Sequence, residues 1–211
     1  MSATTVSAVP VTRIAPLQAP FAPAVAERLA RQMGRNLQPP IALLRLFARD
    51  EALSAAIEPL GRFNLSLKSA LALRDRELVI LRVCARCHCA YEWGVHIAAF
   101  GEAAGLTPAQ IQASVRASAH ASVDTAADDA TWSARDRAIL AMVDELHDTG
   151  SASDACWSAL AGFLDEQQML QLLVLAGWYH AIAFVCNAVR LPPEPWAAAF
   201  PAADINAADR P

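Results

Sequence analysis

Apolar residues recur every three or four positions through most of the chain between residues 21 and 191, which is the spacing of one buried helix face. In the stretch "RDRELVILRV", for example, Leu78 and Leu81 are three residues apart and lie among charged residues. β-Branched and aromatic residues form no alternating runs, so the sequence gives strands little support. The pattern predicts an all-α protein with a bundle of roughly eight helices.

Polar residues and prolines mark where several of these helices begin. Thr107 followed by Pro108 is typical of a helix start, and Ser133 followed by Asp136 resembles a capping box. The tripeptide Arg-Asp-Arg occurs at residues 74–76 and again 61 residues later, each time before an apolar helix. We interpret this as a faint internal repeat of a helical hairpin.

The two ends differ in composition from the middle. Residues 1–20 are rich in proline, alanine, threonine and valine, and residues 192–211 contain "PPEPW" followed by further alanine and proline. We therefore predict an N-terminal arm at 1–20, one helical domain at 21–191 and a C-terminal arm at 192–211. Arms of this kind are suited to lie across a partner subunit.

Composition and charge narrow the possible partners. The net charge is −4 and no basic stripe is present, which argues against nucleic-acid binding. The five cysteines form an odd number in a chain much larger than a disulfide scaffold, which favours reduced thiols. Residues 1–20 contain no continuous apolar stretch like that of a signal peptide. We expect a cytoplasmic protein.

One segment tests the expectation that the protein does not associate with a membrane. Residues 169–189 contain no Asp, Glu, Lys or Arg and are long enough to span a bilayer. However, Gln171, His180 and Asn187 lie roughly along one side of that helix. A central helix buried by its neighbours explains the segment better than a membrane span does.

The segment "CARCHCAYEWGVH" concentrates chemically active side chains. Cys84, Cys87 and His88 match the attachment motif for c-type haem, and together with Cys89 they could form a zinc cluster or supply a dithiol. Covalent haem normally requires export, and structural zinc usually takes two separated pairs of ligands. We therefore expect neither a metal nor a cofactor here.

Spacing favours a different set of residues. On a helix that starts near Cys89, the side chains of Cys89, Glu92 and His96 fall on one face. A thiol in the first helical turn is favoured as a thiolate, and Glu92 can contact His96 four residues later. Glu77 lies on an apolar helix, where a carboxylate requires a partner. The alternative at this point is an ordinary solvated Glu–His pair.

The same residues resemble a known family. The chain contains Glu77, Cys89, position 92 and His96, separated in turn by eleven, two and three residues. This spacing resembles the frame of the alkylhydroperoxidase D-like proteins, which belong to the carboxymuconolactone decarboxylase family. The stretches "RDRELVILRV" and "YEWGVHIAAFGEAAGLTPAQI" are similar to the family core, which would cover residues 65–125. The resemblance implies an alkylhydroperoxidase D-like helical fold that assembles as a homo-oligomer, either a trimer or a hexamer.

The frame departs from the family's hydroperoxidases at one position. Those proteins have a second cysteine where this chain has Glu92, and the two thiols cycle through a disulfide. Thiol-dependent peroxidase (peroxiredoxin-type) activity would here need Cys89 with Cys84 or Cys87 as the resolving thiol, or with an external thiol. We keep this activity as an alternative.

The frame of this chain resembles more closely the decarboxylase branch of the family, which has no redox pair. It implies a lyase that acts on a small carboxylated lactone or organic acid without a cofactor. His96 would be the general acid/base, Glu92 would tune it, and Glu77 would hold the relay in place. Side chains expected to shape the pocket or pack behind it are Tyr91, Trp93, Tyr179 and His180. A catalytically inactive member that binds a small ligand is the third possibility.

Overall fold

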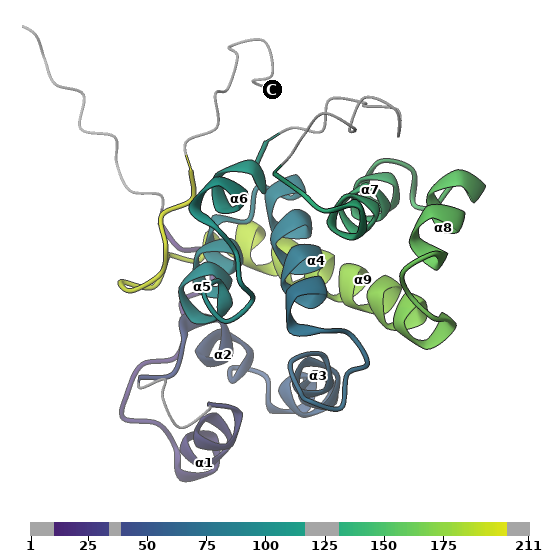
Figure 1. Cartoon of the computed structure of the whole chain (residues 1–211). Coiled ribbons are helices and arrows are strands. Elements are labelled where there is room, and N and C mark those ends of the chain that lie inside the picture. Colours follow the sequence, from purple (N-terminus) through teal and green to yellow (C-terminus); the bar gives the residue numbers. More distant parts are fainter. Residues whose placement is uncertain (1–10, 34–38, 117–130, 202–211) are drawn as a thin grey trace, which may run out of the picture.

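The computed structural model describes residues 11–33, 39–116 and 131–201, and these form an all-helical body (Figure 1). The described residues contain nine helices and no strand. The predicted helical class is therefore confirmed, with one helix more than the rough number expected. The helices are α1 (Pro23–Gln32), α2 (Ala42–Phe47), α3 (Glu51–Asn64), α4 (Leu73–Arg86), α5 (Ala90–Phe100), α6 (Pro108–Ala113), α7 (Ala134–Thr149), α8 (Asp154–Ala161) and α9 (Glu166–Val189).

Local side-chain hydrogen bonds fix where several helices begin. The Ser133 and Thr107 side chains accept hydrogen bonds from backbone N–H groups in the first turns of α7 and α6, and both helices have complete capping boxes. Asp165 forms a third capping box at the start of α9. These contacts satisfy N–H groups that a helix leaves unpaired at its start, which explains the sharp boundaries at these positions.

Helix α4 is the centre of the molecule. Every residue from 75 to 85 is buried, because α5, α7 and α9 all pack against this helix. Figure 1 shows α4 in the middle of the body, with α5 on one side and α7 on the other. A charged residue between positions 75 and 85 therefore lies in the protein interior and needs a partner there.

Ion pairs join α4 to α7. The Arg74 guanidinium donates to both carboxylate oxygens of Asp136 at 3.0 and 2.9 Å, and Arg135 donates to both oxygens of Asp75 at 3.0 and 2.6 Å. Arg82 makes a further two-bond pair with Asp144. The first two residues of each Arg-Asp-Arg tripeptide thus form ion pairs with the first two residues of the other. Partners along the two helices stay 60 to 62 residues apart, so α4 and α7 run in the same direction.

The described parts of both terminal arms contact helices of their own chain. The Arg13 N–H donates to the Val189 carbonyl at the end of α9, at 2.8 Å. In the C-terminal segment, Glu194 accepts hydrogen bonds from the Ala42 N–H and the Tyr91 hydroxyl. The Ala198 N–H donates to the Gly94 carbonyl of α5 at 3.0 Å. This segment therefore ties α2 and α5 together.

Helix α9 is the one helix among the described residues that is long and apolar enough to cross a bilayer. It packs against α4, α5 and α8, and its buried stripe runs from Met169 to Val189. A core helix of a soluble protein passes the same length and hydropathy test.

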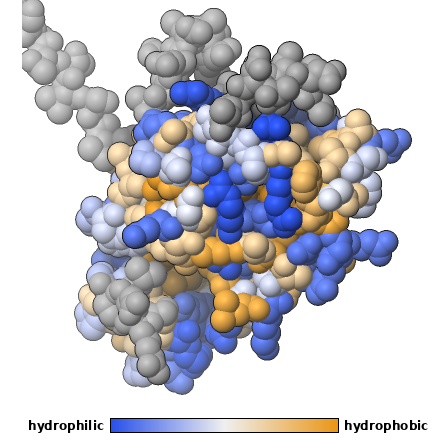
Figure 2. All heavy atoms as spheres, in the orientation of Figure 1, coloured by the Kyte–Doolittle hydropathy of each residue, from blue (hydrophilic) through white to orange (hydrophobic). Residues whose placement is uncertain are grey.

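The surface also carries apolar side chains, which Figure 2 shows as orange areas between hydrophilic ones.

Candidate active site

His96 lies where α4, α5 and α9 meet, and it contacts a side chain from each of the other two helices. Its Nδ1 lies 2.7 Å from Oε2 of Glu77 on α4, and its Nε2 lies 2.9 Å from the Tyr179 hydroxyl on α9. The Tyr179 ring meets the imidazole edge-on at a centroid distance of 5.2 Å. Packing and hydrogen bonds thus hold the imidazole from both nitrogens.

The Glu77 contact sets the tautomer of His96. A carboxylate accepts only, so Nδ1 carries a proton and donates it, which leaves Nε2 as the nitrogen that gains or loses a proton. Burial by itself lowers the pKa of His96, but the Glu77 carboxylate and Glu92 outweigh this, and the pKa lies above its usual value. The Arg76 guanidinium donates to the other oxygen of Glu77 at 3.2 Å. Glu77 is therefore fixed from both sides.

Glu92 lies one helical turn before His96, with its Oε2 at 3.6 Å from Nε2 of that residue. The residue is 4% exposed, and no hydrogen-bond partner is found for Oε1 among the described residues. Burial raises the pKa of Glu92 to about 7, although the neighbouring His96 opposes the rise. Near neutral pH this carboxyl group can therefore either give up or take up a proton.

A cavity of about 510 Å³ opens beside these groups. Glu92, His96 and Tyr179 are polar residues in its lining, to which Arg31 and Arg62 also contribute. The remaining walls are mostly apolar and come from α2, α3, α5 and α9, including Leu43, Phe47, Ile57, Val95, Phe100, Trp178 and Ile182. A mostly apolar pocket with a few converging polar groups is typical of a small-molecule site.

Three thiols that do not line this cavity lie close to one another. Cys89 is the N-cap residue of α5, and its sulfur is hydrogen-bonded by Cys186 of α9 and Cys84 of α4. These two thiols, with help from the backbone N–H groups of Glu92 and Tyr91, lower the pKa of Cys89 against the opposing effect of burial. Cys89 is 0% exposed and is absent from the residues that line the cavity.

The two aromatic residues expected near the pocket have other contacts. Tyr91 donates its hydroxyl proton to Glu194 and accepts a hydrogen bond from the Leu43 N–H at 3.0 Å. The Trp93 indole N–H donates to the Ser114 hydroxyl at 3.1 Å. Neither side chain is among those lining the cavity. Through these hydrogen bonds both side chains attach α5 to other parts of the chain.

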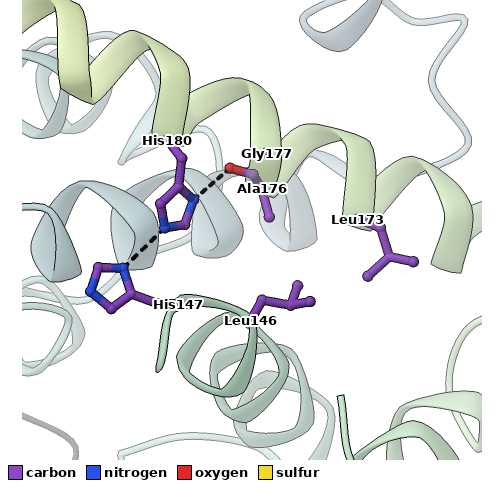
Figure 3. A pocket seen from close by; sticks show the side chains of 6 residues that line it. All are labelled: Leu146, His147, Leu173, Ala176, Gly177 and His180. Carbon is purple, nitrogen blue, oxygen red and sulfur yellow. Dashed lines mark hydrogen bonds between the residues drawn. The ribbon is translucent and has the colours of Figure 1, made fainter. Parts of the chain in front are cut away.

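Of the two α9 residues expected to shape the pocket or pack behind it, Tyr179 lines the cavity and His180 does not. Successive residues on a helix point about 100° apart, so neighbouring side chains face different surroundings. His180 instead faces His147 of α7, with His180 Nε2 at 3.0 Å from His147 Nδ1, in a second pocket (Figure 3). Cys87, considered as a resolving thiol, lies with its sulfur 4.0 Å from His147 Nδ1.

Sequence reasoning missed Cys186 and His147. A signal for Cys186 was available, because it follows Tyr179 by seven residues and two helical turns return a side chain to the same face. His147 gave no such signal. Its neighbours come from α4 and α9, and only the packing of α7 against these helices brings the three together.

Comparisons with known proteins agree with this fold. Residues 51–138 match the carboxymuconolactone decarboxylase family. No curated protein sequence matches the chain.

Solved structures extend the match over more of the chain. An uncharacterised peroxidase-related protein from Silicibacter sp. TM1040 superposes with a TM-score of 0.69 at 16% identity, covering 92% of this chain and 96% of its own. The debrominase Bmp8 gives 0.64 at 16% identity, covering 87% and 92%. A protein of unknown function from Agrobacterium tumefaciens, related by name to the antioxidant defence protein AhpD, gives 0.57 at 18% identity, covering 68% and 91%. At these identities the likeness establishes the fold alone.

Proposed function

The chain belongs to the carboxymuconolactone decarboxylase family through residues 51–138, and from this premise we propose that it is a cofactor-independent lyase of decarboxylase type. Its substrate would be a small carboxylated lactone or a related organic acid. The observation that supports this choice is that Glu92, His96 and Tyr179 line the cavity, whereas Cys89 does not line it and is 0% exposed. A substrate in the cavity would reach acid/base groups before it reached a thiol.

The chemistry needs one proton and no oxidant. The bond between the ring carbon and the carboxylate breaks, CO₂ leaves, and the electron pair moves toward a carbonyl oxygen to form an enolate. A proton then adds to carbon, so the net reaction consumes one proton and releases one CO₂. An acid near the carbon and a hydrogen-bond donor near the enolate oxygen both lower the barrier.

The side chains facing the cavity fit these two roles. Glu92, whose pKa of about 7 keeps it partly protonated at neutral pH, would deliver the proton, and His96 Nε2 would exchange protons with it. Tyr179 would supply a hydrogen bond, because burial raises its pKa well above the usual value and the hydroxyl keeps its proton. Glu77 would act through His96 as a positioning residue.

The test is release of labelled CO₂ from a panel of carboxyl-labelled lactones and small organic acids. We expect Glu92→Gln and His96→Gln each to lower the rate by about 100-fold or more. Cys89→Ser, measured on the same panel, should keep most of the activity. Unchanged turnover in Glu92→Gln and His96→Gln would overturn the assignment. Binding of a panel compound without CO₂ release would indicate a ligand-binding protein instead.

The thiol cluster supports a second candidate, a thiol-dependent peroxidase. The Cys89 thiolate would attack a hydroperoxide, forming an S–O bond as the O–O bond breaks and the alcohol leaves with a proton. Cys186 or Cys84 would then attack the sulfenic acid, forming a disulfide and releasing water, and an external dithiol would reduce the disulfide. Contact of both thiols with Cys89 is the observation that favours this route.

Mass spectrometry after a pulse of an organic hydroperoxide separates the two candidates. The peroxidase requires a reversible disulfide between Cys89 and Cys186 or Cys84, which Cys186→Ser and Cys84→Ser would distinguish. Cys156, which is buried on α8, is the matched control thiol. Cysteines that stay reduced while the panel releases CO₂ would leave the lyase as the activity of this site.

A further inference from the structure

A second group of reactive side chains lies outside the proposed active site. Cys87 follows the last residue of α4, His147 lies in the last turn of α7, and His180 lies on α9. Their ligand atoms all fall within 4.8 Å of one another. Figure 3 shows the two imidazole rings pointing toward each other from α7 and α9 across a pocket.

The separations are close to those a tetrahedral zinc ion would impose. With Zn–N near 2.0 Å and Zn–S near 2.3 Å, two nitrogen ligands lie about 3.3 Å apart, and a nitrogen and a sulfur lie about 3.5 Å apart. The observed distances are 3.0 Å between His147 Nδ1 and His180 Nε2 and 4.0 Å between Cys87 Sγ and His147 Nδ1. These two separations differ from the tetrahedral values by about 0.3 and 0.5 Å, and all three ligand atoms lie within 4.8 Å of one another.

Surrounding contacts orient two of the three groups. His180 Nδ1–H donates to the Ala176 carbonyl at 2.8 Å, which directs its Nε2 lone pair toward His147. This is the usual arrangement around a metal-binding histidine. The Asn187 side chain donates to the Cys87 carbonyl at 2.7 Å and so holds the backbone that carries the thiol.

The charges around these three side chains are compatible with a bound cation. The C-terminal ends of α4 and α7 both meet here, and helix C-termini carry partial negative charge. The nearby Arg86 is balanced by ion pairs with Asp148 and Asp144. A thiolate and two neutral imidazoles would give a bound divalent ion a net charge of one.

We propose that Cys87, His147 and His180 bind one zinc-type divalent transition-metal ion per chain. Thiolate and imidazole ligands suit zinc and cobalt rather than magnesium or calcium. Three protein ligands leave the fourth position for water or a small anion, and the pocket of about 250 Å³ lined by Leu146, Leu173 and Gly177 offers room beside them. This site is separate from the proposed lyase site and does not depend on that function.

The experiment uses the full-length protein, reduced and freed of metal with a chelator. Co²⁺ is titrated by absorption, since a thiolate ligand adds a charge-transfer band in the near ultraviolet and tetrahedral geometry gives strong visible bands. Zn²⁺ affinity is then measured by competition with a chromophoric chelator. We expect one ion per chain and a rise in the unfolding temperature on binding.

Variants decide which residues bind the ion. His147→Gln and His180→Gln should weaken binding by at least about tenfold, and Cys87→Ser should abolish the charge-transfer band. The matched control is His88→Asn, because His88 is exposed in the same turn and Asn tolerates its positive φ of 51°. Circular dichroism shows which variants remain folded.

Three outcomes would overturn the site. Binding weaker than millimolar would mean that His147 and His180 only share a hydrogen bond. Full-strength binding in Cys87→Ser would remove the thiol from the site. Loss of binding in His88→Asn or Cys84→Ser would place the ion at the cysteine-rich turn before α5 instead.

Discussion

Among the side chains around His96, Glu92 stands apart because only one of its two carboxylate oxygens lies near a partner. Charged and titratable groups surround it from several elements, namely His96, Cys89, Glu77, Glu194, Tyr179, Cys84 and Cys186. Cys89, Glu194 and Glu77 raise the pKa of Glu92 and so act in the same direction as burial. The neutral carboxyl is thus the form that the fold favours, and this has a consequence for stability.

Glu92→Gln should flatten the dependence of stability on pH. The pKa of Glu92 is about 7 in the fold and 4.5 normally, so between these values the folded chain holds a proton that the unfolded chain has lost. The free energy of unfolding therefore falls as pH rises through this interval, by up to about 3 kcal/mol. His96, with its raised pKa, contributes in the same direction, so the quantity to compare is the slope of wild type against variant.

Urea unfolding at pH 4.5, 6 and 8 provides the measurement. The control is Glu102→Gln, which removes an exposed carboxylate just beyond the end of α5. Equal slopes for wild type and Glu92→Gln would show that Glu92 is charged in the fold and that its burial has been compensated in another way.

At the scale of elements, the C-terminal segment and α5 approach so closely that one glycine is required. A Cβ atom on Gly94 would lie 2.4 Å from the Ala198 carbonyl oxygen and 3.3 Å from the Ala197 Cβ. Real Cβ atoms do not come that near to backbone, so the segment would have to move. This contact holds the outer side of the helix whose other side carries Glu92 and His96.

Gly94→Ala should therefore destabilise the protein by about 1–3 kcal/mol and loosen residues 194–198. Gly177→Ala on α9 is the matched control, because a Cβ there meets no atom within 4 Å and alanine is the better helix former by about 1 kcal/mol. Thermal unfolding and limited proteolysis after residue 191 would report both effects. A Gly94→Ala protein as stable as wild type would show that the segment shifts freely.

Helices were the part of the structure that the sequence could predict. Their periodic apolar faces and the caps at Thr107 and Ser133 are local signals, and helices do begin directly after these two residues. The residues of the candidate site were harder to predict from the sequence. Cys89, Glu92 and His96 share one helix, so spacing alone relates them, whereas Cys186 and His147 belong to helices whose angular positions only tertiary packing determines.

At the scale of the whole molecule, exposed apolar side chains on α9 indicate self-association. Leu170, Val174 and Phe184 are 63%, 43% and 64% exposed, and their spacing places them on one face of that helix. We propose that a second copy of the chain covers this face in a trimer or hexamer. Sedimentation should then give three or six times the chain mass of 22.5 kDa.

The double variant Leu170→Glu/Val174→Glu should dissociate that assembly, since each buried carboxylate would lose its hydration. Leu67→Glu is the control, because Leu67 is fully exposed in the turn before α4 and should not affect assembly. A wild-type protein that sediments as a monomer would contradict the proposal directly.

The reciprocal ion pairs between α4 and α7 imply an internal twofold axis. A half-turn that moves each residue 61 positions along the chain carries Arg74 onto Arg135 and Asp75 onto Asp136, and so exchanges the two pairs. The same rotation carries Glu77 onto Ala138, where no carboxylate exists to hold an imidazole. The pseudosymmetry therefore relates the ion-paired parts of α4 and α7, and the position on α7 that corresponds to Glu77 holds a buried alanine in place of a second carboxylate.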